Sequence, residues 1–99
     1  LSRIESGGWR PNPVWCAVAD MAADVRGAVR DAAAAREVVL RADIAPDAEQ
    51  VWADPTALRQ VVGNLVENAV RHTHQGTVTI VARRGEGLVD VAVTDTGVG

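Results

Sequence analysis

The sequence predicts an α/β fold, a two-layer sandwich in which helices cover one face of a mixed, largely antiparallel sheet. Two stretches carry apolar residues at intervals of three and four, and about four shorter stretches are rich in β-branched residues. A helix and a sheet each have an apolar face to bury, and layering one on the other buries both. The chain of 99 residues is long enough for one such domain.

The first helix is expected over residues 14–36. It follows a connector at residues 9–13, which two prolines keep out of regular structure. Residues 1–8 are interpreted as the last turn of a preceding helix, which Gly-Gly ends. The apolar positions that should face the core recur at helical spacing: Val18, Met21, Ala22, Val25, Ala28, Val29 and Ala32.

The second helix should run from residue 54 to about residue 72, and Gln75-Gly76 should end it. Asp54 can accept hydrogen bonds from the free amide groups of the first turn. Pro55 suits the first helical position because its missing N–H costs nothing there. The stripe expected to face the core comprises Leu58, Val61, Val62, Leu65 and Ala69.

The strands are expected at residues 38–44, 50–53, 77–84 and 88–94. The first two flank a loop that contains Pro46. The last two flank Gly-Glu-Gly and should form an antiparallel hairpin with a glycine-rich turn. The inward residues of the hairpin should be Val78, Ile80 and Ala82 against Val89, Val91 and Val93, or else the alternate faces.

Composition narrows the classes of function. The net charge of −3 argues against sequence-independent nucleic-acid binding, which needs a basic surface. The single cysteine, Cys16, excludes an internal disulfide and a cysteine metal site, and it agrees with a reducing cytosol. No apolar run approaches the ~20 residues of a membrane span and no signal peptide opens the chain, so we expect a soluble segment without direct membrane contact. With three Trp but no Phe or Tyr, the core should be aliphatic.

The candidate site residues lie on the other face of the second helix and at the end of the chain. Asn64 and Asn68 lie one turn apart with Arg71 beyond them, an unusual set for a solvated face because Asn is a poor helix former. A carboxamide oxygen suits Mg²⁺ that already carries phosphate oxygens, and Arg can grip a phosphate. Asp95, before a Gly-x-Gly turn, offers acceptors for an exocyclic amine. Two accidental Asn and an ordinary turn are the alternatives.

Two motifs resemble those of the sensor histidine kinases of two-component systems. NLVENAVRHT, residues 64–73, resembles the N box of that family, NLxxNAxKY(T), and DTGVG, residues 95–99, resembles its first glycine box, DxGxG. WADPTALRQVV, residues 52–62, resembles the lead-in to the N box, and residues 1–8 resemble the end of the dimerisation helix pair. The resemblance implies the nucleotide-binding fold shared with gyrase, the Hsp90 chaperones and MutL, with residues 9–99 as the ATP-binding domain.

On the second helix, the resemblance assigns residues to the phosphates. Asn68 matches the asparagine that coordinates the Mg²⁺ bridging the ATP phosphates. Asn64 matches the first asparagine of the box, which assists at the phosphates or the metal. Arg71 stands where the family usually has a phosphate-contacting Lys, so the charge is kept.

Other positions are matched to the nucleoside. Asp95 matches the residue that binds the adenine amino group, and Gly97 and Gly99 shape that wall. His72 stands at the usual Tyr position beside adenine or ribose, and a helix-end histidine near water is the alternative. A metal pair of His72 and His74 is disfavoured because no third ligand is near in the sequence.

Asn64 also separates subfamilies within the resemblance. The ATP-hydrolysing members, and the serine kinases that act as anti-sigma factors, carry Glu four residues before the metal Asn, where it can take a proton. An amide is not a base, so Asn64 favours holding ATP for transfer to an imidazole on another domain. Glu67 is interpreted as a surface charge or an outer partner of the site, with a role as proton acceptor left open.

The family's phosphoacceptor box, His-Glu/Asp followed by Pro, does not occur, so no catalytic residue is assigned to this chain. The sequence stops before the family's ATP lid and second glycine box, so the free chain is expected to bind ATP weakly, if at all, and to have no kinase activity alone. The resemblance implies a histidine-bearing dimerisation domain and a response regulator as partners, and a cytoplasmic, homodimeric parent. Membrane anchoring of the parent stays open. An ATPase of the same superfamily and an interaction domain that has lost the nucleotide are the alternative functions.

Overall fold

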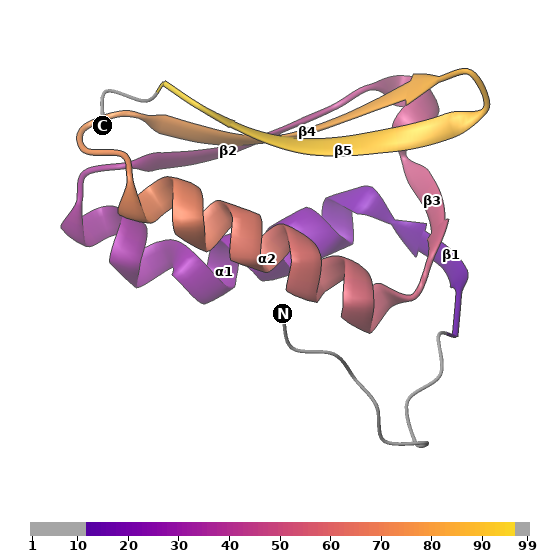
Figure 1. Ribbon diagram of the computed structural model, residues 1–99, viewed down its shortest axis with the longest axis horizontal. Helices are drawn as coiled ribbons and strands as arrows, with labels where there is room; N and C mark the ends of the chain where they lie inside the picture. The colour runs from indigo at the N-terminus through magenta and orange to yellow at the C-terminus, as the bar shows by residue number, and fades with distance from the viewer. Residues whose placement is uncertain (1–11, 97–99) are drawn as a thin grey trace.

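The computed structural model describes residues 12–96, so the prediction for residues 1–8 and the site residues Gly97 and Gly99 lie outside the described part. The described elements are drawn in Figure 1. In chain order they are β1 (Val14–Ala17), α1 (Val18–Ala35), β2 (Val39–Ile44), a 3₁₀ turn (Pro46–Ala48), β3 (Gln50–Ala53), α2 (Pro55–Arg71), β4 (Thr77–Gly85) and β5 (Leu88–Asp95).

The strands form a three-stranded sheet and a separate ribbon. The sheet has the order β2-β4-β5, with β2 parallel to β4 and β4 antiparallel to β5. The ribbon pairs β1 with β3 in antiparallel register. Both helices lie against the same face of the sheet (Figure 1). The predicted α/β sandwich with a mixed, largely antiparallel sheet is therefore confirmed.

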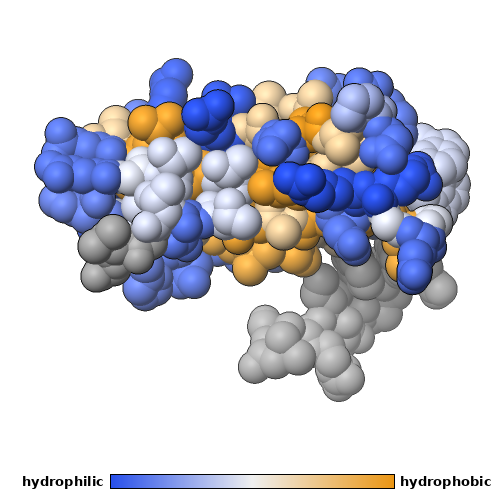
Figure 2. All heavy atoms as spheres, turned by 90° about the horizontal axis from the view of Figure 1, so that it is seen from above, coloured by the Kyte–Doolittle hydropathy of each residue, from blue (hydrophilic) through white to orange (hydrophobic). Residues whose placement is uncertain are grey.

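The β4–β5 hairpin forms where the sequence predicts it. Its turn holds Glu86 at φ 37° and Gly87 at φ 82°, and two successive positive φ values match the right-handed twist of the strands. Val78, Ile80 and Ala82 are buried, and the facing residues of β5 are partly buried, so the first of the two inward sets is confirmed. The opposite face of the sheet mixes polar and apolar residues (Figure 2).

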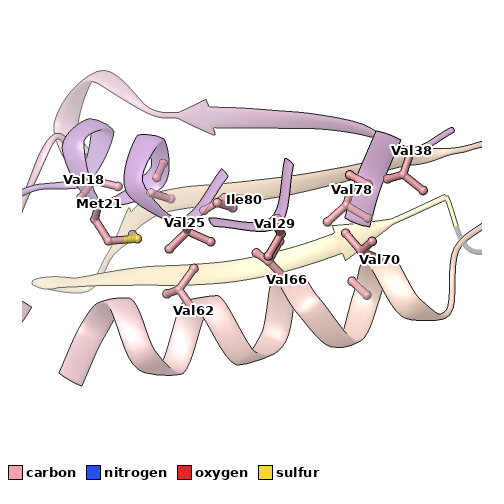
Figure 3. Close-up of a cluster of buried hydrophobic side chains, with 14 of the residues drawn as sticks. Val18, Met21, Val25, Val29, Val38, Val62, Val66, Val70, Val78 and Ile80 are labelled. Carbon is pink, nitrogen blue, oxygen red and sulfur yellow. The ribbon is translucent and has the colours of Figure 1, made fainter. Parts of the chain in front are cut away.

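The core is aliphatic, as the composition requires. Valines of α1 and α2 point toward one another beneath the buried face of β4 (Figure 3). The largest fully enclosed apolar side chains are those of Val18, Val66, Val78 and Ile80, each at most 1% exposed. Because these four come from α1, α2 and β4, the core joins the helix layer to the sheet.

The buried stripe of α2 differs from the predicted one. Val61 is 58% exposed and Leu65 is 46% exposed, whereas Val66 and Val70 are enclosed. The helix is apolar over a wide arc, and the arc that meets both α1 and the sheet is centred on Val66. A smaller correction applies to α1, where Ala33 is buried and Ala28 and Ala32 are exposed.

Residues 14–17 are a strand, not the start of the first helix. They pair with β3, and the helix begins where the Val18 amide donates to the Glu49 carbonyl at 2.9 Å. On the outer face of this ribbon Trp15 lies opposite Trp52, with ring centroids 5.4 Å apart in an edge-to-face arrangement. Their exposed fractions are 64% and 56%, so the ribbon carries its two indoles at the surface.

The start of α2 agrees with the prediction. Asp54 Oδ1 accepts hydrogen bonds from the Thr56 and Ala57 amides at 2.9 and 3.2 Å, and Oδ2 accepts one from the Asn12 amide at 2.8 Å. These hydrogen bonds hold the pKa of the Asp54 carboxyl below its usual value, and the bond from the Asn12 amide has the largest effect. Within residues 12–96 no helix is long and apolar enough to cross a membrane.

Candidate functional site

A pocket of about 230 Å³ opens between the C-terminal half of α2 and the end of β5. Its lining comprises Leu65, Asn68, Ala69, His72, Val93 and Asp95. In Figure 1 the end of α2 and the end of β5 lie at the same end of the molecule. The pocket therefore combines an apolar wall from both elements with three polar side chains at its mouth.

The polar side chains come from two elements that are far apart in sequence. Asn68 and His72 are one turn apart on the last part of α2, and His72 Nδ1 lies 2.8 Å from the Asn68 carbonyl oxygen. A carbonyl oxygen only accepts, so Nδ1 carries the proton in this hydrogen bond. Asp95 is the last residue of β5, in register with Val78 of β4.

Two other predicted site residues of α2 do not line this pocket. Asn64 lines a different hollow, between α1 and α2, together with Asp24, Arg59 and Glu67. Arg71 Nη2 lies 3.4 Å from Glu67 Oε1, with both side chains more than 60% exposed. A solvated ion pair of this kind contributes little energy, so the guanidinium can exchange Glu67 for an anion of higher charge.

The apolar lining is not part of the site that the sequence predicts. The sequence places Leu65 and Ala69 in the core stripe and Val93 on the inward face of the hairpin, whereas in the structure these residues line the pocket with Asn68 and Asp95. A signal for Leu65 was available in the sequence, because the helix carries more apolar residues than one buried face needs.

The volume of the pocket limits the size of the group that it can enclose. Its volume is below the ~300–1,000 Å³ of pockets that enclose a whole small ligand, so a larger ligand would extend beyond it. Leu65, Ala69 and Val93 supply apolar lining to the pocket, and Asp95 supplies a carboxylate to the same pocket. A larger hollow of about 400 Å³ lies between α1 and β2, but it contains none of the predicted site residues.

The donor set at the pocket fits Mg²⁺ that is bound together with phosphates. Within residues 12–96 no hydrogen bond engages the Asn68 carboxamide, and the side chain is exposed. Mg²⁺ takes one or two protein oxygens and completes its shell with water and substrate phosphate. A single carboxamide oxygen at the mouth of the pocket meets that requirement.

Comparisons with known proteins identify a related family. The family model "Histidine kinase-, DNA gyrase B-, and HSP90-like ATPase" matches residues 53–99, which contain α2 and all six pocket residues. Among curated relatives, the histidine protein kinase DivJ of Caulobacter vibrioides is 44% identical over 63 residues. That match covers 63% of this chain and 11% of DivJ, so this chain spans about a tenth of the relative's length.

Solved structures share the fold. Full-length ShkA in complex with AMPPNP matches with a TM-score of 0.80 at 23% identity, over 93% of this chain and 20% of that chain. The histidine kinase ThkA in complex with the response regulator protein TrrA matches with a TM-score of 0.75 at 20% identity, over 88% of this chain and 26% of that chain. At these identities the likeness concerns the fold.

Proposed function

Because this chain belongs to the histidine kinase-, DNA gyrase B- and HSP90-like ATPase family, we propose that it is the ATP-holding part of a sensor histidine kinase. In this proposal residues 9–99 belong to the ATP-binding domain and residues 1–8 to the end of a dimerisation helix. The parent enzyme is a cytoplasmic homodimer, or the cytoplasmic part of one, that transfers phosphate to a response regulator.

The observation that carries the proposal is the meeting of Asn68, His72 and Asp95 around one pocket with apolar walls. Adenine presents an exocyclic amine, which donates hydrogen bonds, and the Asp95 carboxylate only accepts them. Leu65 and Val93 pack against the faces of the ring, where apolar contact replaces water. The base therefore enters the pocket, and the ribose and phosphates extend past His72 and Asn68.

The residues of α2 hold the phosphates in place. Asn68 supplies a neutral oxygen to Mg²⁺, and the ion when bound neutralises the phosphate charge. Arg71 exchanges its exposed contact with Glu67 for a charge-assisted contact with a phosphate oxygen. Asn64 faces the groove between α1 and α2, and its predicted assistance at the phosphates requires the side chain to turn toward Asn68.

The chemistry that these residues support is positioning. An imidazole nitrogen of the dimerisation domain attacks the γ-phosphorus with its own lone pair, the bond to the β-phosphate oxygen breaks, and ADP leaves. The attacking nitrogen brings its own electrons, so this domain supplies orientation and charge neutralisation without a carboxylate base at Asn64. The phosphohistidine then passes its phosphoryl group to the response regulator. ThkA, crystallised with the response regulator protein TrrA, is a kinase with this kind of partner.

The test is a calorimetric titration of the chain with a non-hydrolysable ATP analogue, with and without Mg²⁺. Asp95→Asn should weaken binding about tenfold, because a neutral amide oxygen replaces the charged acceptor of the adenine amine and the new amide N–H group gains no partner there. Asp90→Asn, an exposed change on the same strand, is the matched control and should bind as wild type. Asn68→Ala should remove only the part of the affinity that depends on Mg²⁺. A folded wild-type chain that ignores millimolar nucleotide, or equal losses in the two β5 variants, would contradict the proposal.

A further inference from the structure

The turn that follows α2 is held by three hydrogen bonds. Arg36 Nε donates to the Thr73 carbonyl at 3.0 Å, and the Gln75 amide donates to the Arg36 carbonyl at 3.0 Å. The Val39 amide donates to the Gly76 carbonyl at 2.8 Å. These bonds tie residues 72–76 to the end of α1 and the start of β2, so the turn is a fixed base beside the pocket.

The end of β5 is joined to Thr77, the residue directly after this turn, by two hydrogen bonds, one of which uses the Thr96 side chain. The Thr77 amide donates to Thr96 Oγ1 at 3.0 Å, and the Thr96 amide donates to the Thr77 carbonyl at 3.0 Å. Both hydrogen bonds of Thr96 therefore go to Thr77, the residue directly after the turn. Thr96 is also the residue directly after Asp95, so the attachment lies next to the pocket carboxylate.

The position of the Thr96 hydroxyl depends on a missing side chain. A Cβ added at Gly76 would collide with Thr96 Oγ1 and would stand 2.9 Å from Thr73 Cγ2. Any residue other than glycine would push the hydroxyl away from the Thr77 amide or displace the turn. Gly76 and Thr96 are thus a matched pair, in which one supplies the space that the other occupies.

We propose that Thr96, seated over Gly76, is a positioning residue that fixes Asp95 relative to Asn68 and His72. This inference rests on the proposed nucleotide function and extends it. The pocket has one wall on α2 and one on β5, and its shape requires that the two ends keep a constant separation. The Thr96 hydroxyl provides a direct link, because it joins the end of β5 to the chain that leaves α2. Thr96 itself does not line the pocket.

The test compares Thr96→Val, which removes the hydroxyl and keeps the shape, with Thr96→Ser, which keeps the hydroxyl. Thr94→Val, two residues earlier on β5 and exposed, is the control. Thr96→Val should weaken binding of the ATP analogue about 3- to 10-fold, the loss expected for one hydrogen bond, and Thr96→Ser should restore it. Gly76→Ala should reproduce the Thr96→Val result, because it displaces the same hydroxyl.

A positioning role differs from general stabilisation in its effect on selectivity. A loss of folded protein weakens the ATP and GTP analogues by the same factor, whereas misplacement of Asp95 weakens ATP more, since the carboxylate recognises the adenine amine. Thr96→Val should therefore lower the ratio of ATP to GTP affinity, and Thr94→Val should leave it unchanged. An unchanged ratio in Thr96→Val would overturn the inference.

A ligand-free measurement keeps the two proposals separate. The backbone order parameter of Asp95, from NMR relaxation, should fall from about 0.85 toward 0.6 in Thr96→Val and stay at its wild-type value in Thr94→Val. If wild type binds no nucleotide, the proposed function fails, and this order parameter still decides whether Thr96 fixes Asp95. An Asp95 that is equally rigid in wild type and Thr96→Val would refute the positioning role.

Discussion

The same substitution, glycine to alanine, should have opposite effects on stability at different positions of this fold. Gly27 lies in the middle of α1 and Gly63 in the middle of α2, and a Cβ at either position would meet nothing within 4 Å. At Gly76 the added Cβ would collide with Thr96 and press on Thr73. Local geometry therefore fixes the sign of each effect.

The magnitudes follow from helix propensity and packing. Glycine inside a helix costs about 1 kcal/mol relative to alanine, mainly because the unfolded chain loses more freedom on folding. Gly27→Ala and Gly63→Ala should each raise the free energy of unfolding by about 1 kcal/mol. The hollows that the two glycines line share no residue, so the double variant should gain about 2 kcal/mol. Gly76→Ala should lower the free energy of unfolding by about 1–3 kcal/mol through overpacking.

The assay is urea unfolding monitored by far-ultraviolet circular dichroism. The slope m, the dependence of the unfolding free energy on urea concentration, should be the same in every variant, because a changed m would mean a changed unfolded or native state. In a domain of this size about 1 kcal/mol corresponds to roughly 4–8 °C in Tm, so the helical double variant should melt about 8–16 °C higher. A neutral or destabilising Gly63→Ala would refute the reasoning, because it would show that the open space beside α2 is needed by the fold. A Gly76→Ala variant as stable as wild type would refute the account of the Thr96 contact.

Two further predictions concern the core and the start of α2. Val66→Ala should lower the free energy of unfolding in urea by about 2–3 kcal/mol, because Val66 is fully enclosed. Val61→Ala, on the same helix but 58% exposed, should stay within about 0.5 kcal/mol of wild type. Equal losses would show that the buried stripe is misplaced. The hydrogen bonds that lower the pKa of Asp54 contribute stability above its ordinary value of 3.8 and lose it as pH falls through the lower folded-state pKa. The free energy of unfolding, measured from pH 7 down to pH 2, should therefore fall below about pH 4 in wild type relative to Asp54→Asn, whose cap does not titrate. The same pH dependence in both proteins would contradict this.

The elements that follow from local signals were predictable from the sequence. The start of α2 is set by Asp54 and Pro55, which act within one helical turn, and both occupy the expected positions. The hairpin follows from alternation and from a turn that needs positive φ at Glu86 and Gly87. In each case the residues that determine the structure are neighbours in the chain.

The parts that depend on distant partners were not predictable in this way. Residues 14–17 continue an apolar pattern that suits a helix, and only their pairing with β3 makes them a strand. Val61 and Leu65 have the character of core residues, yet α1 and the sheet pack on the neighbouring arc of α2. The same displacement leaves Leu65 in the pocket wall, so the error in the core hid a residue of the candidate site.

Among the candidate site residues, the motifs predicted a common neighbourhood for Asn68, His72 and Asp95, and the pocket contains all three. Asn64 and Arg71 belong to the same motif but do not line the pocket. Asn64 lines the hollow between α1 and α2, and Arg71 contacts Glu67 at the surface. A motif defines which residues share a helix face, whereas side-chain orientation on a solvated surface depends on the ligand that they meet. Their assignment to the phosphates stays a prediction.

The paired indoles of the β1–β3 ribbon determine what optical spectroscopy of this protein can report. Tryptophan is the only aromatic residue type in the chain, so near-ultraviolet absorption and emission come from three side chains, of which Trp15 and Trp52 stand 5.4 Å apart. The strong far-ultraviolet transitions of two indoles at that separation couple, and the two rings should give an exciton pair in far-ultraviolet circular dichroism. The ribbon and the end of β5 lie at opposite ends of the molecule (Figure 1), so this signal follows the integrity of the ribbon while the pocket fills or empties.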